Sequence, residues 1–74
     1  MSLTGLGAPI TGRVVGFDAD TGWGVIASDG GIEFPFHCTA IADGTRTIEA
    51  GIAVSFHLMP GHRGQWEAAG VTAR

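Results

Sequence analysis

The chain divides into short β-forming segments separated by turns rich in glycine, aspartate and proline. The clearest segment is residues 52–58, in which Ile52, Val54, Phe56 and Leu58 alternate with small or polar side chains. Alternation of this kind indicates a half-buried strand, because successive side chains of a strand point to opposite faces. The 13 glycines and the scarcity of strong helix formers agree with it. The sequence therefore predicts an all-β chain with many turns.

The turn signals set the expected boundaries of these segments. In chain order, strands are expected at residues 11–17, 22–28, 32–37, 52–58 and 65–72, with a 3₁₀ turn at 39–41 and the longest loop at 42–51. Gly16 inside the first strand indicates a bulge or a bare patch. Pro35 has no N–H to donate, so it indicates an edge strand or a break in pairing. Pro60 and Gly61 are expected to end the fourth strand.

Five short strands in 74 residues favour a small closed barrel, because closure removes exposed sheet edges at little cost in length. Residues 11–74 are expected to form one domain, and residues 1–10 a flexible lead-in. Met1 to Leu3 are set aside as residues that cloning can add. The side chains expected to fill the core are Val14, Ile26, Phe34, Phe36, Ile41, Ile52, Val54, Phe56, Ala69 and Val71.

Composition excludes several classes of protein. The single cysteine, Cys38, has no internal disulfide partner, which fits a reducing cytoplasm. One cysteine and three scattered histidines lack zinc spacing, so neither a metal nor a cofactor is expected. No serine, cysteine or carboxylate is paired with a base at a catalytic spacing, so we do not expect an enzyme. No apolar run is long enough to span a bilayer, and no basic segment precedes an apolar one, so neither a membrane span nor a secretory signal is expected.

Charge argues against strong electrostatic binding of nucleic acid. Seven acidic residues outnumber four arginines, there is no lysine, and the net charge is −3. Nucleic-acid-binding proteins ordinarily carry a basic surface, because neutralised phosphates supply much of the affinity. Any nucleic-acid binding by this chain must therefore depend more on base stacking and hydrogen bonds than on charge.

Residues 21–26 (TGWGVI) place Trp23 between two glycines, which are expected to clear space around it. Alternation puts Trp23 and Val25 on one face of their strand. In the next strand, Pro35 and His37 share a face opposite Phe34 and Phe36. A tryptophan beside a strand that presents a histidine is the arrangement of a base-stacking surface. An ordinary half-buried strand with one aromatic plug explains the spacing equally well.

The order of these motifs resembles that of bacterial cold-shock domains. Residues 12–26 (GRVVGFDADTGWGVI) are similar to the opening motif G-x-V-K-W-F-N-x-x-K-G-F-G-F-I, and residues 33–41 (EFPFHCTAI) to D-V-F-V-H-F-S-A-I. Residues 51–56 (GIAVSF) are similar to G-Q-x-V-x-F, and residues 66–72 (WEAAGVT) to P-Q-A-x-N-V-T. The resemblance implies a small five-stranded antiparallel OB-fold (oligonucleotide-binding) barrel with at most one short 3₁₀ turn. It also implies a cytoplasmic RNA chaperone or transcription modulator that binds single-stranded RNA or DNA.

The family's binding residues are kept only in part. Its two motif lysines fall at Val15 and Thr21, and its first-strand tryptophan falls at Gly16. The nucleic-acid-binding set that the resemblance implies is Phe17, Trp23, Val25, Glu33, Pro35, His37, Arg46, Arg63 and Trp66. We therefore expect binding weaker than that of typical members.

A second hypothesis keeps the barrel but changes its partner. The face would then bind a protein, or a second copy of the chain in a weak homodimer. The acidic charge and an apolar surface favour this hypothesis, and that surface comprises Val15, Gly16, Val25, Pro35 and Cys38. The retained Trp23 and His37 favour nucleic acid.

Overall fold

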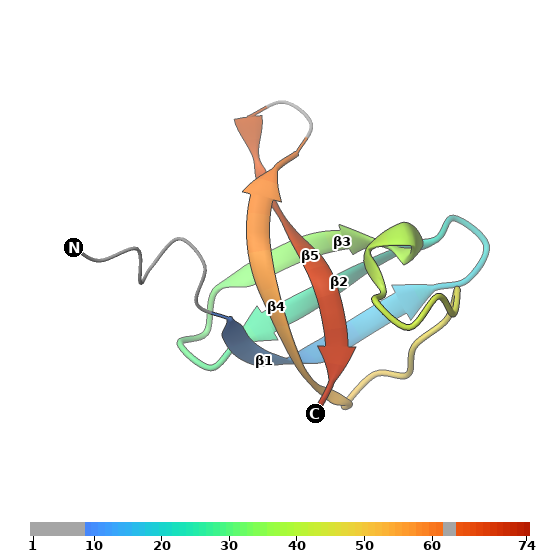
Figure 1. Ribbon diagram of the computed structural model, residues 1–74, viewed down its shortest axis with the longest axis horizontal. Coiled ribbons are helices and arrows are strands. Elements are labelled where there is room, and N and C mark those ends of the chain that lie inside the picture. The colour runs from blue at the N-terminus through green and yellow to red at the C-terminus, as the bar shows by residue number, and fades with distance from the viewer. Residues whose placement is uncertain (1–8, 62–63) are drawn as a thin grey trace.

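The computed structural model describes residues 9–61 and 64–74. Its elements are β1 (Ile10–Asp18), β2 (Trp23–Ser28), β3 (Glu33–His37), the 3₁₀ turn η1 (Cys38–Ala40), β4 (Ala53–Pro60) and β5 (Trp66–Ala73). The strands pair antiparallel in one sheet of order β3-β2-β1-β4-β5. The β4–β5 hairpin crosses the layer formed by β1, β2 and β3 (Figure 1). The expected all-β, five-stranded OB architecture is confirmed.

The sheet curls so that its two ends meet. β3 lies close to β5, and Ile41, just after η1, forms an isolated parallel bridge with Val71. The Ala42 N–H donates to the Val71 carbonyl at 2.8 Å. Pro35 lies in β3, which stands at one end of the hydrogen-bonded strand order. This position fits a residue that has no N–H to donate.

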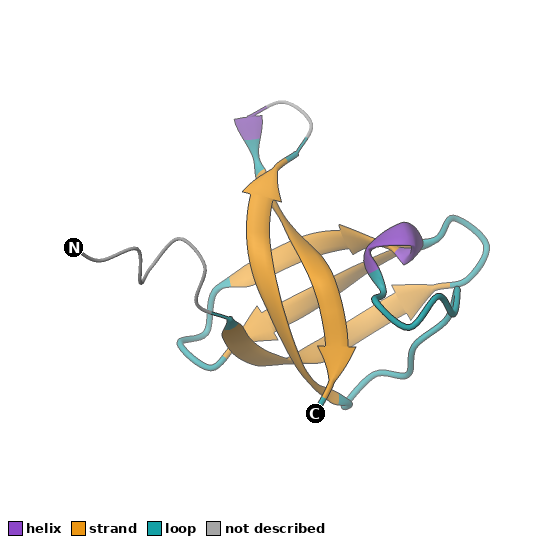
Figure 2. Ribbon diagram, in the orientation of Figure 1, coloured by secondary structure: helices purple, strands orange, loops and turns teal. Residues whose placement is uncertain are grey.

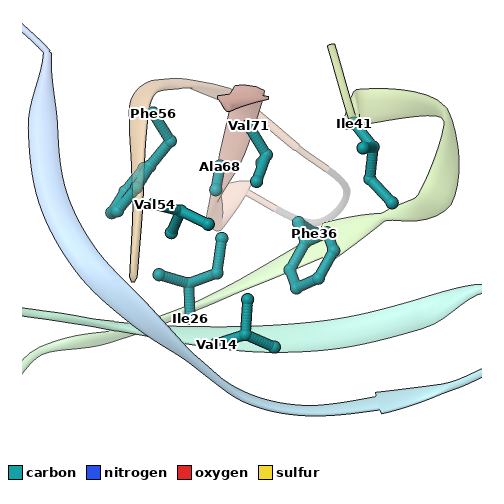
Figure 3. Close-up of a cluster of buried hydrophobic side chains, with 8 residues drawn as sticks. All are labelled: Val14, Ile26, Phe36, Ile41, Val54, Phe56, Ala68 and Val71. Atoms are coloured by element: carbon teal, nitrogen blue, oxygen red, sulfur yellow. The ribbon is translucent and has the colours of Figure 1, made fainter. Parts of the chain in front are cut away.

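The core lies between the β1–β3 layer and the β4–β5 hairpin, and Figure 3 shows side chains from both converging there. The buried apolar residues are Val14, Ile26, Phe36, Ile41, Val54, Phe56, Ala68, Ala69 and Val71. Phe34 and Ile52, expected inside, are only partly buried and pack against this cluster. Ala68 was not expected. It is buried together with its neighbour Ala69, near the register shift between β4 and β5.

Two expected boundaries are wrong. Ile10 belongs to β1, where it pairs with Phe56, rather than to a lead-in. β4 continues through Pro60, which lies opposite Trp66. Figure 2 draws a short helical fragment at the hairpin tip, at Gly64, beside residues that the structure does not describe. The lead-in at residues 1–8 also lies outside the described residues.

A β-bulge in β1 decides which side chains reach the outer surface. Val14 pairs with Ile26 and Gly16 pairs with Val25, so Val15 is the extra residue. Because side chains alternate with a period of two, one extra residue exchanges the two faces for the rest of the strand. The bulge suggested by Gly16 is confirmed.

Candidate nucleic-acid interface

The side chains of β1, β2 and β3 that point away from the core form a surface that we call the platform. The strand registers arrange it in cross-strand rows, which are Asp18–Trp23–His37, Gly16–Val25–Pro35 and Arg13–Ala27–Glu33. The structure therefore brings together Trp23, Val25, Pro35, His37 and Glu33, as the sequence predicted. Directly opposite residues of antiparallel strands have Cβ atoms about 4.5–5.5 Å apart. The members of a row can consequently act on one ligand.

Trp23 is the large aromatic residue of the platform, and 39% of its surface is exposed. Its ring centroid lies 4.9 Å from that of His37, with the planes inclined at 66°. This edge-on contact supports the indole from the side of β3. The exposed part of the ring is available for stacking with a flat ligand.

The glycines beside Trp23 have different roles. A Cβ at Gly22 would lie 3.2 Å from His37 Nε2, and the φ of Gly22 is +79°. Gly22 therefore lets the β1–β2 turn pack against the histidine. A Cβ at Gly24 would lie 2.6 Å from the Phe36 ring, so Gly24 faces the core. The expectation that both glycines clear space around Trp23 is wrong for Gly24, which makes room for Phe36 instead.

Phe17 lies on the face opposite to Trp23. It pairs with Gly24 and stacks on Phe36, with ring centroids 5.9 Å apart. It is partly buried and packs against the core. The sequence placed Phe17 in the binding set, whereas the bulge at Val15 turns its ring inward and gives it a structural contact.

His37 is held in one orientation by the residue two positions further on. The Thr39 N–H donates to His37 Nδ1 at 3.4 Å, which caps η1, and the Thr39 hydroxyl lies 3.0 Å from the same nitrogen. A neutral imidazole that accepts at Nδ1 carries its proton on Nε2. The Nε2–H is therefore a hydrogen-bond donor at the end of the Trp23 row.

Few cations accompany these rings. The Arg13 guanidinium donates to the Gly51 carbonyl at 3.0 Å, which ties it to the loop before β4. Arg46 is exposed in the 42–51 loop. In that loop, the Thr45 N–H and hydroxyl donate to Asp43 Oδ1 at 3.0 and 2.7 Å, and they lower the pKa of the Asp43 carboxyl. Arg63 lies outside the described residues.

Trp66 is exposed but stands apart from the platform. It begins β5 opposite Pro60, at the end of the hairpin that projects beyond the barrel in Figure 1. A groove of about 480 Å³ lies between η1 and this hairpin, with His37, Met59 and Glu67 among its lining residues. His37 thus contributes both to the Trp23 row and to the wall of the groove. The sequence did not predict this groove.

An OB barrel with an exposed tryptophan and a partly buried histidine on the outer face of β1–β3 defines a class of single-stranded nucleic-acid-binding proteins. The family model described as 'Cold-shock' DNA-binding domain matches residues 10–74, and the chain belongs to this family. Members of the family are nucleic-acid-binding proteins rather than enzymes.

Curated relatives agree with this assignment. The chain is 43% identical over 63 residues to the cold shock-like protein CspD of Bacillus cereus. The aligned region covers 84% of this chain and 94% of that protein. The chain is 41% identical over 54 residues to the cold shock protein CspB of Bacillus caldolyticus, covering 72% and 82% respectively. Cold shock protein 1 of Arabidopsis thaliana is 38% identical over 65 residues, but only 22% of that longer protein is covered. Within the described residues, no helix is long and apolar enough to cross a membrane.

Proposed function

We propose that residues 10–74 bind single-stranded RNA or DNA through the platform, with bases stacking on Trp23 and His37. The observation that carries this proposal is the contact of exposed Trp23 with partly buried His37 on the outer face of β1–β3, in a chain of the cold-shock family. An RNA chaperone or transcription modulator acting in the cytoplasm would use such a site. Val25, Pro35 and Glu33 complete the contact surface.

We further propose that binding is weak, in the micromolar range or poorer. A base stacked on an aromatic side chain is worth about 1–3 kcal/mol by alanine substitution. The platform rows contain only one tryptophan and one histidine ring, because Gly16, Val25 and Pro35 fill the middle row. Arg13, the arginine of the platform, already bonds to Gly51. A nanomolar complex at about 0.15 M salt would contradict this proposal.

Tryptophan fluorescence tests the proposal directly. Trp66 also emits, so the titration is best performed on Trp66→Phe, which leaves Trp23 as the reporter. Saturable quenching by an unstructured RNA or oligo-dT of about seven nucleotides is expected if bases stack on the indole. No quenching at high micromolar strand concentration, in a protein with unchanged circular dichroism, would overturn it.

The affinity should depend only weakly on salt. For single strands, log K falls with log salt at a slope of about −0.7 for each neutralised phosphate. The exposed described arginines outside the strands are Arg46 and Arg74, and one or two phosphate contacts predict a slope of about −0.7 to −1.4. Titrations between about 50 and 200 mM salt measure it. A slope steeper than about −3 would show that phosphate contacts dominate.

His37 should have separable structural and binding roles. Asparagine can present an acceptor near the position of Nδ1, so His37→Asn should keep the η1 cap and melt close to the parent protein. It should nevertheless bind oligonucleotide about fivefold more weakly, because the ring is lost. His37→Ala should lose the same affinity and also about 0.5–1 kcal/mol of stability with the cap. Unchanged affinity in both variants would remove His37 from the binding surface.

A specific observation supports a second function. Val15 is 51% exposed at the bulge, beside the apolar row that contains Val25 and Pro35. An apolar surface of this kind also suits a protein partner or a weak homodimer. Sedimentation at protein concentrations from micromolar to millimolar tests for the homodimer, because self-association raises the measured mass with concentration. Val15→Asp should abolish that rise. A constant monomer mass over that range would exclude the homodimer.

A further inference from the structure

The row that contains Trp23 ends on a carboxylate that the binding set predicted from the sequence did not include. Asp18 pairs with Trp23 on β2, and Trp23 pairs with His37 on β3. The bulge at Val15 places Asp18 on the outer face, because Phe17 before it faces the core. Trp23 is therefore flanked by a carboxylate on one side and by an Nε2–H donor on the other.

The carboxylate is oriented and has free acceptor capacity. Asp18 Oδ1 accepts the Asp20 N–H at 2.9 Å. A carboxylate has about four lone-pair sites, so Oδ2 and one site on Oδ1 stay available to a ligand. Asp18 is exposed, and no arginine in the described part of the chain forms an ion pair with it. A base stacked on Trp23 would meet an acceptor-only group at this edge.

We propose that Asp18 is a specificity-determining residue and that the Trp23 position prefers guanine. This proposal depends on the proposed nucleic-acid function. Guanine presents two adjacent donors, N1–H and N2–H, on its Watson–Crick edge, and they match the two oxygens of a carboxylate. Uracil and thymine present one donor between two carbonyl oxygens. Adenine and cytosine present one donor beside a ring-nitrogen acceptor.

The chemistry of the other bases explains why this position discriminates. A carbonyl oxygen or ring nitrogen directed at the Asp18 carboxylate leaves two acceptors facing each other. A good bidentate pair with a base edge discriminates against the wrong base by about tenfold or more. Inosine keeps N1–H but lacks the N2 amine, so it isolates the second hydrogen bond without changing the protein.

The test compares the heptanucleotides UGUGUGU, UIUIUIU and UUUUUUU, in lithium buffer to suppress guanine quadruplexes. Affinities are taken from the titration midpoints of Trp66→Phe, since guanine also changes the extent of quenching. We expect UGUGUGU to bind about tenfold more tightly than UUUUUUU, and UIUIUIU to lose most of that advantage. Equal affinity for UGUGUGU and UUUUUUU would overturn the guanine preference.

Asp18→Asn, made in the same background, is the decisive variant. Asparagine retains one acceptor for the Asp20 N–H, and it is the residue at this place in the cold-shock motif, so the turn should be kept. The ratio of guanine to uracil affinity should fall to about twofold, while affinity for UUUUUUU is unchanged or higher because a negative charge is lost. Glu49→Gln removes an exposed carboxylate of the 42–51 loop, outside the platform rows, and should keep the preference.

The outcomes separate the two proposals. A guanine preference that survives Asp18→Asn, or that is lost equally in Glu49→Gln, overturns the role of Asp18 while the platform remains a binding site. No binding of any heptanucleotide overturns both the platform and the role of Asp18.

Discussion

Replacing Trp23 with alanine should weaken oligonucleotide binding by about tenfold or more, with little change in thermal stability. Removing a stacking ring costs about 1–3 kcal/mol of binding free energy. Trp23 is 39% exposed and does not belong to the buried core, so the fold does not depend on it. Fluorescence anisotropy of a labelled heptanucleotide measures the loss, because the variant no longer carries the intrinsic reporter.

Trp66→Ala is the matched control for this experiment. Trp66 is also an exposed tryptophan, at 55%, but it lies at the tip of the β4–β5 hairpin, away from the Trp23 row. We expect a smaller loss of affinity from Trp66→Ala than from Trp23→Ala. Equal affinity of Trp23→Ala and the parent protein would show that bases do not stack on the platform. A larger loss in Trp66→Ala would move the site to the hairpin and its groove.

Phe36→Ala should destabilise the protein by about 3–5 kcal/mol, because a large, fully buried aromatic side chain leaves a cavity. Phe36 stacks on Phe17 and covers Gly24, so it joins three strands beneath the Trp23 row. A domain of this size has a total stability of only about 4–11 kcal/mol. The variant should therefore be partly or largely unfolded at 37 °C, as measured by urea titration of the circular dichroism signal.

Phe34→Ala provides the comparison within the same strand. Phe34 is only partly buried and contacts Phe56 at a centroid distance of 6.0 Å. Phe34→Ala should lower the free energy of unfolding clearly less than Phe36→Ala does, since the gap that it leaves is open to solvent and can relax. If both substitutions lower the free energy of unfolding equally, the different burial of Phe34 and Phe36 does not determine how much each stabilises the protein.

Local sequence signals were sufficient for the strands and for part of the site. The alternation at residues 52–58 and the turn residues between segments identified each strand to within a few positions. Alternation also placed Trp23 with Val25 in β2 and Pro35 with His37 in β3, and the cross-strand pairing brings these two pairs onto one face. These features depend on residues that lie only a few positions apart in the chain, so the local sequence pattern is sufficient to predict them.

Features that depend on contacts between different strands could not be predicted from the sequence in the same way. The register between β4 and β5 shifts between Ala69 and Thr72, so that Ala68 rather than Ala69 joins Val71 in the core cluster, whereas simple alternation from Val71 would select Ala69. Gly24 was interpreted as space for Trp23, whereas its neighbour in space is the Phe36 ring from β3. Thr39 is a partner of His37 because η1 begins directly after β3.

The sequence by itself determined an all-β barrel that resembles the cold-shock family, and it indicated Trp23 and His37 as candidates for a base-stacking surface. Only the tertiary structure decided which residues of β1 join them. Side-chain alternation has a period of two, so the single extra residue at Val15 moves every later side chain of β1 to the opposite face of the sheet. Phe17 consequently packs inward on Phe36, and Asp18 reaches the Trp23 row. Whether a bulge occurs at Val15 depends on the register with β2, which β1 alone does not specify.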